Sequence, residues 1–111
     1  MLRTIDKATV KALMNELKAG LQAIYGSRLR GLYLYGSYAR GEADPGSDLD
    51  VLVVLDRIDC YSAEIDRTSQ LGSDLSLKFG VSVAKVYLRE CDWLERESPF
   101  LANVREEAIA A

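Results

Sequence analysis

Apolar residues recur at steps of three or four near the start of the chain: Val10, Leu13, Leu17, Leu21 and Ile24. This spacing is typical of a helix that packs one face against a core. Asp6 is a suitable N-cap, and Gly26 suits the position after the last turn. We therefore predict a helix that begins after Asp6 and ends near Tyr25.

The helical spacing returns twice further along the chain. Leu71, Leu75 and Phe79 mark the inner face of a helix expected from Tyr61 to Phe79, with Gly80 ending it. Ser98 and Pro99 suit an N-cap and a first helical position, and they open a last helix. Its expected inward residues are Phe100, Leu101, Val104 and Ala108. Between these helices, Asp92 to Glu95 is expected to form a short turn.

Three shorter apolar segments predict strands, at Leu32 to Tyr35, Asp48 to Leu55 and Val81 to Leu88. Side chains alternate along a strand, so Asp48 and Asp50 share one face of the second segment with Leu52 and Val54. Leu49, Val51, Val53 and Leu55 share the other face. Both faces are apolar beyond Asp50, which favours a central strand that is covered on both sides.

The order helix, strand, strand, helix, strand, helix predicts an α+β fold, a small mixed β-sheet with helices packed against it. A chain of 111 residues is long enough for one core but not two, so we expect a single domain over residues 1–111. The longest aliphatic run, Val51 to Leu55, is too short to cross a bilayer. The first seven residues lack the apolar core of a signal peptide, so we expect a cytoplasmic protein without a membrane partner.

Composition narrows the chemistry further. The chain has no histidine, and its two cysteines, Cys60 and Cys91, lie far apart in sequence, so zinc and copper sites are excluded. We expect both cysteines as reduced, packed thiols. Any metal would be a hard ion held by carboxylates, Mg²⁺ or Mn²⁺. The net charge of −3 and the scattered basic residues argue against duplex nucleic acid as a partner.

The segment from Gly36 to Asp50 carries the most chemical information. Gly36 and Ser37 form a turn directly after the first predicted strand, where backbone amides can bind phosphate oxygens. Ten residues on, Asp48 and Asp50 open the second strand, and two carboxylates at this spacing can share a divalent metal ion. Taken alone, Gly36 and Ser37 also fit an ordinary turn, and Asp48 and Asp50 also fit a polar loop that enters a strand. Arg40 can reach a phosphate or pair with a neighbouring acid, Glu42 or Asp44.

These residues carry a resemblance to a known superfamily. The pattern Gly36-Ser37-x-Ala39-Arg40-Gly41, then Ser47-Asp48-x-Asp50 before an apolar strand, resembles the signature of the nucleotidyltransferase superfamily that includes polymerase beta and kanamycin nucleotidyltransferase. The short length resembles its minimal nucleotidyltransferases, which are paired with HEPN-domain proteins in toxin–antitoxin modules. The motif covers about fifteen residues, and the predicted order of elements agrees with that fold over most of the chain.

The resemblance implies a role for each matching residue. Gly36, Ser37, Arg40 and Ser47 would bind the nucleoside triphosphate, and Asp48 and Asp50 would be the catalytic metal ligands for Mg²⁺ or Mn²⁺. A hydroxyl would attack the α-phosphorus, with ATP as the expected substrate and AMP as the transferred group. The implied acceptor is a tyrosine of a HEPN-domain toxin, which gives this chain an antitoxin role. Assembly into a homo-oligomer also stays open.

The chain departs from that pattern at one place. Many members of the superfamily carry a third carboxylate on the following strand, and Val81 to Leu88 contains no acidic residue. Ser82 and Ala84 are the residues expected to face the two aspartates, or the odd-numbered residues of this segment if the register is shifted by one. One alternative that therefore stays open is an antitoxin that binds nucleotide or partner without efficient catalysis. A separate alternative is a subunit of an aminoglycoside-type nucleotidyltransferase, which would require additional helical material from a second subunit.

Overall fold

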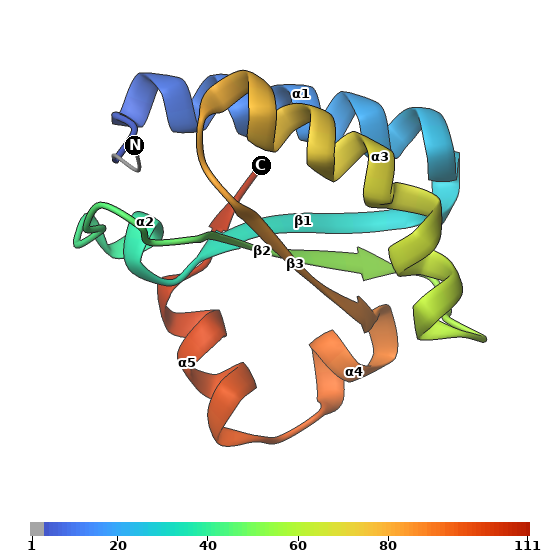
Figure 1. Ribbon diagram of the computed structural model, residues 1–111. Coiled ribbons are helices and arrows are strands. Elements are labelled where there is room, and N and C mark those ends of the chain that lie inside the picture. Colours follow the sequence, from blue (N-terminus) through green and yellow to red (C-terminus); the bar gives the residue numbers. More distant parts are fainter. Residues whose placement is uncertain (1–3) are drawn as a thin grey trace.

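The computed structural model describes residues 4–111 (Figure 1). Helices and strands alternate over most of its length. In chain order the elements are α1 (Lys7–Tyr25), the 3-10 turn η1 (Gly26–Arg28), β1 (Leu29–Tyr35), α2 (Ser37–Arg40), β2 (Leu49–Leu55), α3 (Tyr61–Phe79), β3 (Val83–Arg89), α4 (Glu90–Glu95), α5 (Pro99–Glu107) and β4 (Ile109–Ala110).

The strands form one mixed sheet in the order β3-β2-β1-β4. β1 is antiparallel to β2 and to β4, and β2 is parallel to β3. The antiparallel β1–β2 pair is reached through the loop that contains α2, whereas the parallel β2–β3 pair is connected through α3. The predicted α+β class, a small mixed sheet with helices against it, is confirmed.

Helices cover both faces of this sheet (Figure 1). α1 and α3 lie on one face, and α4 and α5 lie on the other. The predicted alternation along β2 is confirmed. Leu49, Val51, Val53 and Leu55 belong to the larger core under α1 and α3, while Leu52 and Val54 join Leu101 and Val104 of α5. Asp50 therefore belongs to the α5 face of the sheet.

Local capping explains where the helices begin and end. The Asp6 carboxylate accepts a 2.8 Å hydrogen bond from the backbone N–H of Thr9, so the predicted start of α1 is confirmed. Ser98 Oγ accepts one of 3.1 Å from Leu101 N, with Pro99 at the first helical position of α5. Gly80 ends α3 in the left-handed conformation, at φ 70°.

Several boundaries differ from the sequence prediction. β1 begins at Leu29, three residues earlier than expected, and β2 begins at Leu49, so Asp48 precedes the strand. β3 is shifted toward the C-terminus, and the turn expected at Asp92 to Glu95 belongs to α4. The two-residue strand β4 was not predicted, because two residues carry no periodicity.

Four residues expected to be buried are exposed. Ile24 is 38% exposed and Phe100 is 47% exposed, although each follows the spacing of its helix. Cys60 and Cys91 are free thiols, as expected, but both are exposed and not packed. Within residues 4–111, no helix has both the length and the apolar character needed to cross a membrane.

Candidate functional site

The candidate site lies where β1 ends and β2 begins. These ends are adjacent because the two strands are antiparallel, and Tyr35 pairs with Asp50 across them. The loop between the strands starts with Gly36 and the short helix α2, which Gly41 ends in the left-handed conformation. The pairing thus places the Gly36 turn against Asp50, although the two are fourteen residues apart in sequence.

Gly36 is the residue that permits this approach. Its φ of 77° lies in a region that disfavours side chains, and a Cβ at this position would collide with the Asp50 carboxylate oxygen Oδ2. Gly36 is also buried. The backbone of the turn and the carboxylate of Asp50 can therefore lie in direct contact only because position 36 carries no side chain.

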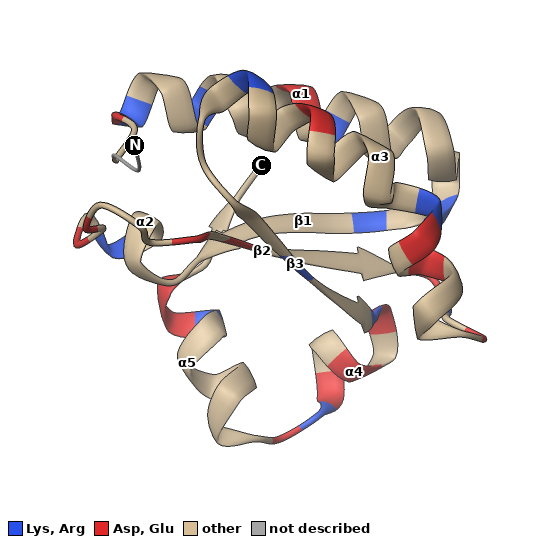
Figure 2. Cartoon of the chain, viewed as in Figure 1, with Lys and Arg blue, Asp and Glu red and all other residues tan. Residues whose placement is uncertain are grey.

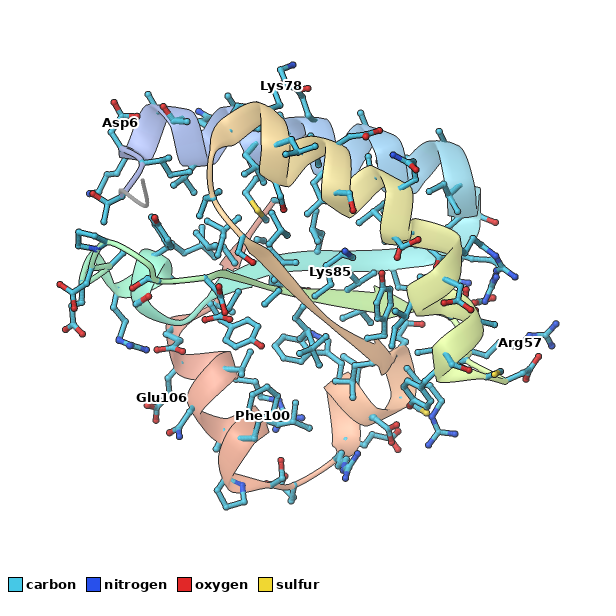
Figure 3. All side chains as sticks on the ribbon, viewed as in Figure 1. Asp6, Arg57, Lys78, Lys85, Phe100 and Glu106 are labelled. Carbon is cyan, nitrogen blue, oxygen red and sulfur yellow. The ribbon has the colours of Figure 1, made fainter. Side chains whose placement is uncertain are left out.

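A surface pocket of about 700 Å³ brings most of the predicted residues together. Gly36, Ser37, Arg40 and Asp50 line one side of it, and residues of α5 line the other. Phe100 of α5 meets the Tyr35 ring edge-on, with ring centroids 5.8 Å apart. Phe100 borders this pocket, which explains why it is half exposed (Figure 3).

Two predicted residues do not line this pocket. Asp48 is exposed and lies just before β2. Ser47 orders the preceding loop, since its hydroxyl accepts a 3.0 Å hydrogen bond from Asp44 N and its own N–H donates to Asp44 O at 2.9 Å. The contacts of Ser47 are thus those of a turn residue, and its contact with a nucleotide stays a prediction.

The electrostatics of Asp50 indicate an excess of negative charge. Its pKa is raised, first by partial burial and then by the charges of Asp48 and Glu107, while Arg40 acts in the opposite direction. Figure 2 shows acidic segments at the start of β2 and at the C-terminal end of α5. A cation bound between Asp48 and Asp50 would relieve this repulsion.

The donors available fit a hard divalent metal ion. Asp48 and Asp50 supply carboxylate oxygens, the ligands that Mg²⁺ and Mn²⁺ prefer, and phosphate oxygens and water can complete the coordination. Among residues 4–111, no three His, Cys, Asp or Glu side chains gather closely enough to hold a metal. The metal would thus depend on two carboxylates of the chain and on its substrate.

The position on β3 beside Asp50 carries no carboxylate. In the parallel register of β2 and β3, Asp50 pairs with Ala84, so Ala84 is the β3 residue on the same face of the sheet. Ser82 is exposed and precedes β3. No side chain at either position can act as a carboxylate base.

Sequence reasoning missed one residue at this site, Glu107. One of its carboxylate oxygens accepts a 3.0 Å hydrogen bond from Gly36 N, and the other accepts one of 2.8 Å from Arg40 Nη1. Arg40 also donates to Glu42 at 3.1 Å, one of the partners considered for it. Glu107 is 71 residues from Gly36 in sequence, so no local motif signals this contact.

Known proteins resemble this chain in sequence. Residues 14–109 match the family described as "Nucleotidyltransferase domain". "Putative protein adenylyltransferase MJ0604" of Methanocaldococcus jannaschii is 30% identical over 108 residues, which cover 92% of this chain and 93% of that protein. "Putative protein adenylyltransferase MJ0141" of the same organism is 28% identical over 78 residues, or 70% of this chain and 78% of that protein.

Solved structures resemble it in fold. One is described as "Crystal structure of the toxin-antitoxin with AMP-PNP", with a TM-score of 0.62 and 22% identity over 87% of this chain and 70% of that one. A second, the toxin–antitoxin MntA-HpeT mutant D39ED41E, has a TM-score of 0.59 and 18% identity over the same shares of the two chains. With the family match over residues 14–109, the fold and the motif agree, and this chain belongs to the nucleotidyltransferase domain family.

Proposed function

We propose that this protein is a Mg²⁺-dependent nucleotidyltransferase that transfers AMP from ATP to a hydroxyl group of a partner protein, in an antitoxin role. The observation that carries the proposal is the contact between the Gly36 turn and Asp50. It joins a place suited to phosphate with a place suited to metal. Mn²⁺ would serve in the same position as Mg²⁺.

Each residue has a part in the proposed reaction. The backbone amides of Gly36 and Ser37 would bind the triphosphate, and the Arg40 guanidinium would pair with it. Asp48 and Asp50 would hold the metal ion, which when bound neutralises charge on the phosphates during transfer. This chemistry rests mainly on positioning and electrostatics, so two carboxylates can support it.

The proposed transfer step balances simply. The acceptor oxygen forms a bond to the α-phosphorus, the bond from that phosphorus to the bridging oxygen breaks, and pyrophosphate leaves with the electron pair. The acceptor proton passes to water, because Ala84 leaves no carboxylate on β3 beside Asp50. We expect slower chemistry than in relatives with a third carboxylate.

The nature of the acceptor rests on the relatives. MJ0604 is named as a protein adenylyltransferase, which supports a protein acceptor and an adenylyl group. The two solved structures come from toxin–antitoxin complexes, one of them with AMP-PNP, and they support a toxin as the partner. We therefore propose that the partner is a HEPN-domain toxin. We also propose that this chain acts as a single domain and that it acts in the cytoplasm.

The test uses ATP labelled at the α-phosphate, Mg²⁺ and the protein encoded by the adjacent gene. We expect label on that partner with the wild-type chain and none with the double variant Asp48→Asn, Asp50→Asn. The exposed loop variant Asp44→Asn removes the same charge nearby and should retain transfer. An unlabelled partner in the presence of folded wild-type protein and Mg²⁺ would contradict the proposal.

A second function is favoured by the Asp50–Ala84 pairing. Without a carboxylate on β3, the chain would neutralise its partner by stoichiometric binding alone. In that case the double aspartate variant still neutralises the toxin. If the enzyme proposal holds, neutralisation is lost with transfer.

A further inference from the structure

The carboxylate of Glu107 occupies the donors that the proposed function assigns to phosphate. Its two oxygens accept hydrogen bonds from Gly36 N at 3.0 Å and from Arg40 Nη1 at 2.8 Å. A carboxylate and a phosphate compete for such donors, because both are anions that bind backbone N–H and guanidinium groups. The Glu107 side chain is 21% exposed, and the hydrogen bond that it accepts from Gly36 N is partly buried.

Glu107 stays charged in this position. The hydrogen bond from Arg40 and the one from Gly36 hold the pKa of Glu107 below its ordinary range. Its negative charge also contributes to the raised pKa of Asp50. Gly36 N and the Arg40 guanidinium thus favour an anion at this position. The negative charges of Asp48 and Asp50 disfavour an anion that binds without a cation.

The segment that follows Glu107 pairs with the sheet over a short length. β4 follows directly and pairs with β1 through two residues, Ile109 and Ala110. Beyond it, Ala111 N donates to Leu32 O at 2.9 Å and Lys18 Nζ donates to Ala111 O at 3.0 Å. Glu107 itself is the last residue of α5. The two hydrogen bonds of its carboxylate run to Gly36 and Arg40 and are not part of the strand pairing, so the side chain can leave the turn without disruption of the sheet.

We propose that Glu107 is an internal competitor for the phosphate position, so that the turn is closed by the chain's own carboxylate until a triphosphate displaces it. The proposal rests on the proposed function, because it assumes that the Gly36 amide and Arg40 bind phosphate. Free protein then binds nucleotide more weakly than the turn alone would allow. The apparent affinity equals the affinity of the open turn multiplied by the fraction of molecules in which Glu107 has left it.

The test compares the binding of two probes, inorganic tripolyphosphate and ATP with Mg²⁺, to the full chain. Glu107→Gln keeps the shape of the side chain and removes its charge, and Glu107→Ala removes the contact altogether. We expect both variants to bind tripolyphosphate about tenfold more tightly than the wild type. The Gly36 amide resonance in a nuclear magnetic resonance titration reports where the probe binds.

Glu106→Gln is the matched control. Glu106 borders the same pocket, is exposed and lies on the outer side of α5 (Figure 3). The Glu106→Gln variant loses the same charge but keeps the hydrogen bonds between Glu107 and the turn. Its affinity for tripolyphosphate should therefore change far less than that of the Glu107 variants. Melting temperatures of the variants establish that each is folded.

The outcomes separate this proposal from the proposed function. Unchanged or weaker tripolyphosphate binding by Glu107→Gln and Glu107→Ala overturns the competitor role, even if the wild type transfers AMP. Loss of transfer in Glu107→Gln without tighter binding also overturns it, and assigns Glu107 a direct part in catalysis. Tighter binding at Gly36 without any transfer to a partner keeps the competitor role and refutes the enzyme.

Discussion

β2 and β3 are parallel neighbours in the sheet, yet they contribute unequally to the site. β2 begins beside the Gly36 turn and presents Asp50 to the pocket. β3 presents Ala84 at the paired position. The residues proposed to bind metal and phosphate thus lie at the start of β2 and in the turn, while the paired position on β3 carries only a methyl group. The comparison between Asp50 on β2 and Ala84 on β3 therefore suggests separate tests for substrate binding and for the rate of the reaction.

The largest effect is expected from the loss of the β2 carboxylate. Asp50→Asn would remove the proposed metal ligand beside the phosphates, and transfer should fall by roughly 10²–10³-fold. The measurement is the rate of label transfer to the partner at saturating Mg²⁺. Asp44→Asn serves again as the control of equal charge. A loss of less than about tenfold would show that Asp50 is not essential for metal binding.

Replacement of Gly36 should affect the fold as well as the site. Gly36→Ala adds a Cβ that collides with Asp50 and strains a backbone at φ 77°, so the free energy of unfolding should fall by roughly 2–4 kcal/mol. Gly41→Ala is the matched control, since its φ is 71° but nothing lies near its added Cβ. Denaturant unfolding of both variants isolates the collision. Equal losses would show that the Gly36–Asp50 approach is not tight.

A carboxylate added to β3 tests directly whether the lack of a general base on this strand limits the rate. A positioned general base contributes about 10²–10⁴-fold, and Ala84→Asp should recover about tenfold because its surroundings are not adapted to it. The rate of transfer at saturating ATP is the measurement. Ser82→Asp, exposed and outside the strand, should give no gain. A slower Ala84→Asp enzyme would show that the lack of this carboxylate does not limit the rate.

The smallest effect concerns stability without metal. Burial and neighbouring charges raise the pKa of Asp50, so the folded state binds more protons there than the unfolded chain. The contribution of Asp50 to stability should therefore decline as pH rises from the ordinary carboxyl pKa of 3.8 to the raised value, and remain lower above it. The melting temperature of the wild type relative to that of Asp50→Asn should fall across this range. A difference that stays constant would show that Asp50 is not the cause.

Local signals allowed most of the fold to be predicted from sequence. α3 has the predicted ends because Gly80 provides a left-handed stop, and α1 begins after Asp6 because that side chain caps it. The alternation along β2 gave the correct partition of its two faces. These features depend on residues close together in sequence.

The features that were missed depend on distant contacts. β4 exists only through pairing with β1, and two residues cannot signal a strand by themselves. Glu107 reaches the turn across 71 residues, and nothing in its neighbourhood distinguishes it from Glu106. Phe100 follows the spacing of a buried residue but borders the pocket. Such contacts follow from how α5 packs, which the local pattern does not specify.

The affinity for ATP, measured by calorimetry with and without Mg²⁺, tests the proposed metal and phosphate ligands together. We expect binding that requires Mg²⁺, and its loss in the double variant Asp48→Asn, Asp50→Asn. We also expect that the Gly36 amide resonance shifts when ATP binds. Equal affinity with and without Mg²⁺, or unchanged binding by the double variant, would contradict the assignment of this site.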